Sequence, residues 1–244
     1  MGGNAFPDVG AIHQSEVEPT LTKLFKQLQL AYPHAILGST GKKEFSGDID
    51  IAIDIPPSEH KEFFQFLKRH FGDHDVRTWG NLFSTHFPIE NYNSSLETER
   101  KRTGKVQVDF IPGNIEWLKF FYHSPAVSKL KGTHRNIAMS SLAGYTDRVE
   151  NNEFDDAQRH TYIERYKWSP TTGFTRVQRT SRRHALTGRW IKKQDEIEIS
   201  KPSQSPADVA NILFKGKCGP EYLDSCEKVI EAILSLELSD ILSF

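Results

Sequence analysis

Residues 48–54 read DIDIAID, so apolar and mostly acidic side chains alternate along this stretch. A period of two is typical of a β-strand, in which the isoleucines face a core and the acids face the opposite way. Asp48 and Asp50 are then neighbours on one face, with Cα atoms about 7 Å apart at roughly 3.3 Å of rise per residue. From that spacing the two carboxylates can converge on one or two divalent cations.

A second alternating stretch, residues 105–111, carries Asp109 on the polar face of another expected strand. If this strand pairs beside the first, Asp109 joins Asp48 and Asp50 around a common point. Three carboxylates on one face of a sheet repel one another unless a cation compensates their charge. The sequence therefore predicts a metal site with these three aspartates as its ligands.

The segment in front of the acidic strand is a loop rich in glycine, lysine and serine. It opens with Gly38 and Ser39, directly after the apolar pair Ile36 and Leu37. Backbone N–H groups and a hydroxyl at such a turn suit a phosphate group. We therefore expect a phosphate site beside the three acids.

These motifs together resemble the nucleotidyltransferase superfamily typified by DNA polymerase β, over about residues 17–140. The resemblance implies that Asp48, Asp50 and Asp109 are catalytic and hold two Mg²⁺ or Mn²⁺ ions. Asp48 and Asp50 would bridge both ions, and Asp109 would ligate the ion nearer the acceptor and assist its deprotonation. The glycine–serine turn and the basic loop would bind the triphosphate of a (d)NTP such as ATP.

The same resemblance implies further contacts to the nucleotide and its template. Residues 121–125 are similar in position to the aromatic and small-residue segment that contacts the sugar in polymerase β-like enzymes. The family's polymerases place an arginine in the loop after the serine, whereas this chain has two lysines there. The implied nucleotide-binding residues are Gly38, Ser39, Lys42, Lys43, Ser46, Gly47, Tyr122 and Ser124.

The remaining periodicity predicts an α+β fold. The resemblance implies a nucleotidyltransferase-type mixed sheet with helices packed on one face. The catalytic domain would span residues 1–143, and a small α+β subdomain with a basic β-hairpin would span residues 144–244. Residues 1–16 contain three glycines and a proline and are expected to be irregular, a loose terminus rather than an arm over the active site. Expected helices cover residues 17–31, 115–122, 126–143, 207–214 and 220–236, and expected hairpin strands cover 76–79 with 82–89 and 166–168 with 174–179.

The charge distribution points to a partner for the second part of the chain. Although the formal net charge is −1, residues 165–193 hold nine lysines and arginines and no acid. Aromatic residues are interleaved with these cations, a combination that suits the phosphates and bases of a nucleic acid. The resemblance to polymerase β-like enzymes further implies that Arg135, in the expected 126–143 helix, lies beside the template strand. The predicted nucleic-acid-binding residues are Arg135, Arg176, Arg179, Arg182 and Arg183.

Composition narrows the class of protein. The 244 residues are 37% hydrophobic and 26% charged, which is typical of a soluble globular protein. No apolar run reaches 18 residues, and the N-terminus lacks the features of a secretory signal. With only Cys218 and Cys226, a disulfide framework or a cysteine zinc site is excluded, so a reducing, cytoplasmic setting is expected.

Two hypotheses from different classes follow. The first is an enzyme that transfers a nucleoside monophosphate to a hydroxyl with release of pyrophosphate. Its favoured acceptor is a nucleic-acid 3′ end, with a small molecule or a protein as the alternative. The second is a non-catalytic nucleic-acid-binding module, against which the presence of all three acids argues.

Overall fold

The structure is a computed structural model that describes residues 5–38, 40–123, 125, 128–130, 132–155 and 157–237, except the side chains of residues 192–194. The chain forms two compact units, Met1–Ala126 and Val127–Phe244. The predicted boundary lay at residue 143, which assigned the helix α4 (Gly132–Tyr145) to the first domain. The structure places α4 in the second unit, because α4 packs on β9 (Gln158–Ser169) and α6 (Cys226–Leu234).

The first unit contains a five-stranded mixed sheet in the order β2-β4-β7-β6-β5. The acidic strand β4 runs parallel to β7, whereas every other neighbouring pair is antiparallel. In register, Asp48 lies opposite Gln107 and Asp50 lies opposite Asp109. This confirms the predicted pairing of the two acidic stretches. The strands are β2 (His34–Ile36), β4 (Asp48–Ile53), β5 (Val76–Trp79), β6 (Leu82–Pro88) and β7 (Lys105–Pro112).

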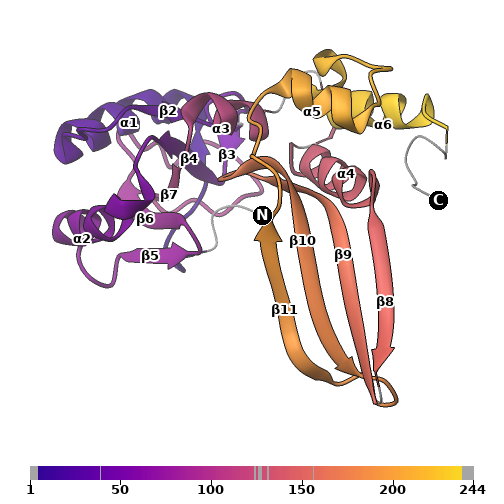
Figure 1. The fold of residues 1–244 in the computed structure, drawn as a ribbon. Helices are drawn as coiled ribbons and strands as arrows, with labels where there is room; N and C mark the ends of the chain where they lie inside the picture. Colours follow the sequence, from indigo (N-terminus) through magenta and orange to yellow (C-terminus); the bar gives the residue numbers. More distant parts are fainter. Residues whose placement is uncertain are drawn as a thin grey trace. The chain divides into compact units, whose positions relative to one another are not determined.

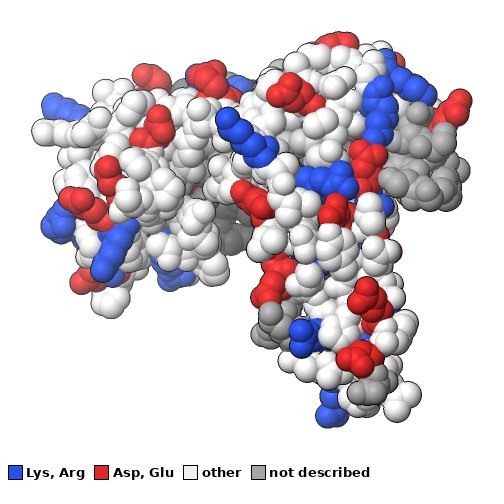
Figure 2. Space-filling view, viewed as in Figure 1, with Lys and Arg blue, Asp and Glu red and all other residues white. Residues whose placement is uncertain are grey.

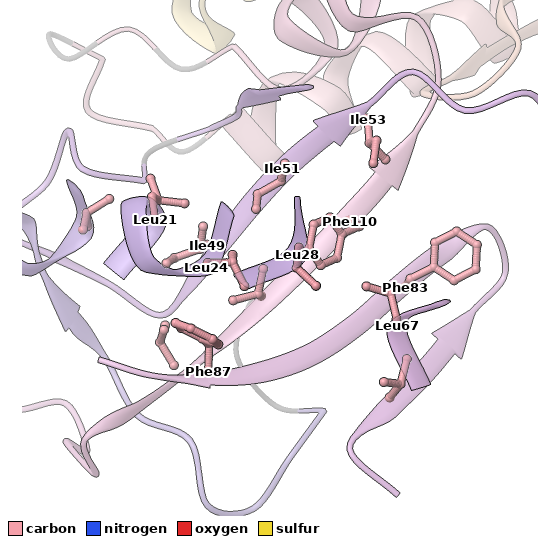
Figure 3. Packing of buried hydrophobic residues seen from close by; sticks show 14 of the residues in the cluster. Leu21, Leu24, Leu28, Ile49, Ile51, Ile53, Leu67, Phe83, Phe87 and Phe110 are labelled. Carbon is pink, nitrogen blue, oxygen red and sulfur yellow. The ribbon is translucent and has the colours of Figure 1, made fainter. Parts of the chain in front are cut away.

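Two helices cover the apolar face of this sheet (Figure 1). They are α1 (Gln14–Leu28) and α2 (His60–Phe71), the latter preceded by a short 3₁₀ turn, η1 (Pro57–Glu59). Figure 3 shows the leucines of α1 against the isoleucines of β4 and against Phe110 of β7. Burying each such side chain stabilises the fold by about 1.5–3 kcal/mol. The alternation of β4 is therefore fixed by its core contacts, and its acids must face the other way.

Helix α1 begins three residues earlier than predicted. The His13 side chain accepts a hydrogen bond from Ser15, and the Glu16 carboxylate accepts one from the backbone N–H of His13, so that the two ends of a capping box are satisfied. The helix ends at Leu28, and Gln29 caps it in the left-handed conformation (φ +47°). These local caps, and not the apolar spacing, set both ends.

The opposite face of the sheet is also partly covered by a helix, which corrects the prediction of helices on one face only. Helix α3 (Ile115–Phe121) packs its Leu118 against Leu37, Ala52 and Ile111. Ala52 is the one apolar residue among the acidic positions of β4, and it lies beyond the acids along the strand. The acidic face thus ends at an apolar patch that α3 fills.

The N-terminal residues contradict the expected loose terminus from Ala5 onward. Ala5, Phe6 and Val9 form a small buried cluster, and the backbone continues into a two-residue strand, β1 (Ile12–His13), that pairs with β3 (Phe45–Ser46). Buried apolar side chains compensate the entropy of ordering this glycine-containing segment. Gly2, Gly3 and Asn4, which an arm would contain, lie outside the described residues.

The second unit is built on a four-stranded antiparallel sheet in the order β11-β10-β9-β8 (Figure 1). The predicted hairpin forms its centre, but β9 and β10 have 12 residues each, far longer than expected. The outer strand β8 was missed because its sequence, VENNEFD, is polar without alternation and all seven residues are exposed. The remaining strands are β8 (Val149–Asp155), β10 (Gly173–His184) and β11 (Trp190–Glu198).

Helices cover one end of that sheet, where β9 ends and β10 begins (Figure 1). The Trp168 indole N–H of β9 donates to the Asn136 side chain of α4 at 3.2 Å, which fixes this contact. The predicted C-terminal helices are confirmed as α5 (Pro206–Leu213), shifted by one residue, and as α6, which begins six residues later than predicted because a 3₁₀ turn, η2 (Pro220–Leu223), precedes it. Among the described residues, no helix combines the length and the apolar character needed to cross a membrane.

Candidate functional site

The three predicted acids lie together on the polar face of the first sheet. Parallel pairing of β4 and β7 sets Asp50 directly beside Asp109, and Asp48 lies two residues before Asp50. One carboxylate oxygen from each residue lies within 4.8 Å of the others. Mg²⁺–oxygen bonds are about 2.0–2.1 Å long, so one ion joins ligand oxygens up to about 4.2 Å apart, and the three carboxylates lie close to that reach.

The electrostatics of the cluster favour a cation. Burial, followed by the charges of Asp48 and Asp109, raises the pKa of Asp50 well above its usual range. Burial also raises the pKa of Asp109, although the Ser84 hydroxyl and the Gln107 amide both act to lower it. Two neighbouring carboxyls with raised pKa values indicate negative charge that the protein itself leaves uncompensated. A bound divalent ion would supply the missing charge.

Two polar side chains that the sequence reasoning passed over hold the acidic strands in place. The Thr40 hydroxyl accepts a hydrogen bond from the backbone N–H of Asp50 at 3.3 Å and is 7% exposed. The Gln107 amide donates to both carboxylate oxygens of Asp109 at 2.9 Å. The signal for Gln107 was its position on the polar face of β7, two residues before the third acid.

The predicted phosphate loop lies against the acids at its first residue. Gly38 has φ +62°, and a Cβ atom added there would be 3.4 Å from the Oδ2 atom of Asp50. Glycine adopts this backbone conformation without strain, and a larger side chain there would be in van der Waals contact with the carboxylate. Ser39 lies outside the described residues, so its predicted phosphate contact stays a prediction.

The other loop residues differ in exposure. Lys42 and Lys43 are exposed at the turn, whereas Ser46 is 5% exposed within β3. Gly47 is half-buried at the bend between β3 and β4. The two lysines are thus accessible to a ligand, and the Ser46 hydroxyl is less so. Their roles in nucleotide binding stay predictions.

Replacing Gly38 by alanine tests whether this close approach matters. We expect Gly38→Ala to destabilise the protein by about 1 kcal/mol, because alanine at positive φ is strained. We also expect it to weaken binding of a Mg²⁺–nucleotide, because the methyl group would occupy space beside the Asp50 carboxylate. Gly80→Ala is the matched control, since Gly80 has φ +61° with open space around it. Chemical denaturation and calorimetry measure both quantities. Equal nucleotide affinity in the two variants would contradict a role for Gly38 at the site.

Tyr122 of the predicted sugar-contacting segment lies close to the acids. Burial, followed by the charges of Asp50 and Asp109, raises the pKa of the Tyr122 phenol to about 12. The residue caps the C-terminus of α3, so the helix sets the position of its ring. The structure therefore brings Tyr122 to the acidic cluster, while Ser124 lies outside the described residues.

Arg135, predicted to lie beside a template strand, is 1% exposed within the second unit. Burial lowers the pKa of its guanidinium to about 10, against an opposing effect from Asp224. A side chain enclosed in this way is not accessible to a nucleic-acid backbone in this conformation. Helical spacing alone did not reveal which face of α4 is buried.

The basic stretch of residues 165–193 is partly neutralised by two glutamates that flank it in the sequence. Arg176 pairs with Glu164 at 3.0 Å, and Arg179 pairs with Glu196 at 2.8 Å. Lys167 also contacts Glu196, at 2.8 Å. The acid-free stretch of residues 165–193 therefore does not act as a block of free cations, because strand pairing brings acids to it from just outside.

Two of the predicted nucleic-acid-binding residues remain exposed on the sheet. Arg182 is exposed and lines a groove of about 540 Å³ with residues of β8, β9 and β10, and Arg183 lies over the Trp190 ring at 3.8 Å from its centroid. In Figure 2, basic and acidic side chains alternate over this sheet instead of forming one basic surface. The groove is lined by Asn151, Glu153, His160, Thr161, Tyr162, Thr180, Ser181 and Arg182.

No protein-family model matches the sequence, and no curated protein matches it. Among solved structures, the chain is similar to two crystal structures of Leishmania infantum polymerase beta. For the ternary P/T complex the identity is 14% and the TM-score 0.41, over 88% of this chain and 77% of that chain. For the ternary gap complex they are 16% and 0.38, over 68% of this chain and 51% of that chain. Both similarities are distant.

Proposed function

We propose that the protein is a metal-dependent nucleotidyltransferase, which moves a nucleoside monophosphate from a (d)NTP to a hydroxyl and releases pyrophosphate. The observation that carries the proposal is the acidic cluster. Two adjacent parallel strands present three carboxylates with ligand atoms within 4.8 Å of one another, beside a glycine turn at Gly38. Transfer from a triphosphate requires carboxylates that hold divalent cations and, beside them, a turn that holds the phosphates.

The donor set fits a hard divalent cation. All three groups are carboxylates, the ligand type that Mg²⁺ and Mn²⁺ prefer. Asp48 and Asp50 would bridge two ions, and Asp109 would hold the ion nearer the acceptor. When bound, the ions would lower the pKa of the attacking hydroxyl and stabilise the charge on the leaving pyrophosphate.

The remaining residues would bind and orient the substrates. Backbone N–H groups of the loop from Gly38 to Gly47, with the Ser39 hydroxyl and the lysines at positions 42 and 43, would hold the triphosphate. The Tyr122 ring, beside the acids, would contact the sugar of the nucleotide. Asp109 would accept the proton of the attacking hydroxyl.

The acceptor that we propose is a nucleic-acid 3′ end. Its support is the exposed pair Arg182 and Arg183, the latter stacked on Trp190, since a cation beside an aromatic ring suits both phosphate and base. The ion pairs of Arg176 and Arg179 reduce the basic surface on which this acceptor was first predicted. A small molecule or a protein side chain is the alternative acceptor.

One experiment tests both parts of the proposal. The protein is incubated with each labelled nucleoside triphosphate, with Mg²⁺ or Mn²⁺, and with a panel of RNA, DNA, protein and small-molecule acceptors. We expect release of pyrophosphate and label on an oligonucleotide, abolished by a chelator. Label on a protein or a small molecule alone would retain the enzyme class and replace the acceptor. No release of pyrophosphate under any condition would contradict the proposal.

The role of the exposed arginines gives a separate prediction. Arg182→Glu with Arg183→Glu should weaken binding to an oligonucleotide and reduce the slope of log K against log salt by about 1–2, because each phosphate contact contributes about one unit. Affinity for the free triphosphate should not change. The matched control is Lys26→Glu with Arg69→Glu, which changes the net charge equally at exposed positions of α1 and α2. Filter binding at several salt concentrations measures the slope for each variant. Identical slopes for both variants would exclude Arg182 and Arg183 as contacts to the oligonucleotide.

A further inference from the structure

Gln107 is a buried amide with both of its polar groups engaged. It is 5% exposed, and its Nε2 atom donates to both oxygens of the Asp109 carboxylate, each at 2.9 Å. Its Oε1 atom accepts a hydrogen bond from the backbone N–H of Ala5 at 2.8 Å. The residue also lies opposite Asp48 in the parallel register of β4 and β7. Gln107 therefore touches one acid of the cluster directly and is the strand neighbour of another.

The hydrogen bond from Ala5 fixes which way the Gln107 amide points. A backbone N–H can only donate, so the amide oxygen must face Ala5 and the NH₂ group must face Asp109. The reversed amide would set a donor against the N–H and a carbonyl oxygen against a carboxylate. The N-terminal segment thus selects the orientation in which Gln107 binds the ionised form of Asp109.

The segment that supplies this N–H, residues 5–11, is anchored along the approach to β7. Backbone N–H groups of Gly10 and Ala11 donate to the carbonyls of Lys105 and Lys101, at 2.9 and 2.8 Å. The Lys105 ammonium donates to the Asp8 carboxylate at 2.8 Å, and the Lys101 ammonium donates to a carbonyl of the segment. The segment is therefore aligned with the strand that carries Gln107.

A second set of contacts holds the start of the segment. The Arg77 guanidinium donates to the Ala5 carbonyl and lies 4.8 Å from the centroid of the Phe6 ring. Phe6 in turn packs edge-on against His86, with ring centroids 5.1 Å apart, and His86 is the register partner of Gln107 on β6. Ala5 is thus fixed from its carbonyl side as well as through its N–H.

We infer that Gln107 is the positioning residue for Asp109, and that the N-terminal segment acts on the metal site through it. The inference rests on the proposed function, in which Asp109 is a metal ligand. The amide holds the plane of the Asp109 carboxylate so that its oxygens stay within ligand distance of Asp48 and Asp50. Partners of this kind set the orientation of a ligand before the ion binds.

The test uses the full-length protein and Mn²⁺ as the probe. Gln107→Met keeps the length of the side chain and removes its hydrogen bonds to Asp109 and from Ala5. We expect its Mn²⁺ affinity, measured by calorimetry without nucleotide, to fall by about tenfold or more. The kcat of nucleotidyl transfer should fall by a similar factor, while the KM for the triphosphate changes by less than about twofold, because the phosphate loop is untouched.

A second variant isolates the N-terminal segment. Ala5→Pro removes the N–H that orients Gln107 and leaves Gln107 itself in place, since proline has no backbone donor. It should lower the Mn²⁺ affinity in the same direction, whereas Ala5→Gly, which keeps the N–H, should bind as the wild type does. Unchanged Mn²⁺ affinity in Ala5→Pro would overturn the role of the segment.

The matched structural control is Thr85→Val. Thr85 is fully buried on β6 and donates one hydrogen bond to the Asp75 carbonyl, and its register partner is Val108, on the core side of β7. This variant should lose stability and keep the Mn²⁺ affinity and kcat of the wild type.

A folded Gln107→Met protein that binds Mn²⁺ as tightly as the wild type overturns the inference. If Gln107→Met does not fold, the Mn²⁺ affinity of Ala5→Pro decides in its place. If the wild type binds Mn²⁺ but transfers no nucleotide, the proposed function fails while the Mn²⁺ comparison still decides the role of Gln107.

Discussion

Replacing Asp50 by asparagine is expected to reduce nucleotidyl transfer by about 10³-fold or more while leaving the fold intact. Asp50 lies opposite Asp109 on β7 and two residues after Asp48 on β4. Its replacement therefore removes the carboxylate that is adjacent to both other acids. Stabilisation by a metal ion in the transition state contributes several kcal/mol, and about 4 kcal/mol corresponds to 10³ in rate. Asparagine has nearly the volume of aspartate, so the packing against β7 is retained. The measurement is single-turnover transfer at saturating Mg²⁺ or Mn²⁺.

The same substitution should raise thermal stability in the absence of metal. The pKa of Asp50 is raised in the folded state, so its protonated form favours folding at low pH, and this contribution is lost as the pH rises through the folded-state pKa. Asparagine does not ionise, so Asp50→Asn does not incur this loss of stability as the pH rises. The difference in melting temperature between the two proteins, measured with a chelator, should be largest near neutral pH and should shrink on acidification.

Asp54→Asn is the matched control for this experiment. Asp54 follows β4 directly and is exposed, outside the acidic cluster. The control should keep both the activity and the melting temperature of the wild type. Full transfer activity in Asp50→Asn would exclude this carboxylate as a metal ligand, and the proposed two-ion site would have to be abandoned.

The sheet of the first unit could be predicted from the sequence because one physical constraint fixes it. The residues at 49, 51 and 53 can be buried only if β4 is a strand with its acids on the opposite face. The same alternation in β7 then places Asp109 on the acidic face. The alternation does not show which hydrogen-bond partner each polar side chain has. Gln107 was visible only as a polar position, and its hydrogen bonds to Asp109 and Ala5 depend on an N-terminal segment that is distant in sequence.

The second unit was harder to predict because its polar residues satisfy one another across strands. Glu164 and Glu196 lie outside the basic stretch in sequence, yet pairing of β9, β10 and β11 sets them against Arg176 and Arg179. A count of charges along the chain cannot include such contacts. Strand β8 has no periodic pattern of apolar residues, because none of its side chains is buried.

Arg102 of the first unit illustrates the same limit, and its replacement should cause the largest loss of stability. Residues 90–104 are polar throughout, a pattern that predicts an exposed loop or a short helix. In the structure, however, the Arg102 side chain is 8% exposed and pairs with Glu16, which is 2% exposed. The two hydrogen bonds between them are 2.9 and 2.8 Å long. The guanidinium also lies 4.7 Å from the centroid of the Tyr92 ring. This pair joins the start of α1 to the loop that leads into β7.

Arg102→Met should lower the free energy of unfolding by about 3–5 kcal/mol, because it leaves the buried Glu16 carboxylate without its counter-charge. Glu16→Gln added to Arg102→Met should recover part of the loss, since the remaining side chain is then neutral. Lys119→Met is the control, because Lys119 forms an exposed ion pair with Glu116, of a kind whose loss costs at most about 1 kcal/mol. Urea denaturation at neutral pH measures all three variants.

The loss should depend on pH in a defined direction. Burial acts to raise the pKa of Glu16, but hydrogen bonds from Arg102, Asn93 and His13 outweigh it and hold the pKa below the usual 4.5. The pair therefore contributes its full stability above about pH 4.5, and that contribution is lost as the pH falls through the lowered folded-state pKa. In Arg102→Met the unpaired Glu16 is stabilised by protonation, so the gap between variant and wild type should narrow on acidification. A gap that stays constant from pH 7 to pH 4 would show that the loss comes from packing of the Arg102 side chain and not from its charge.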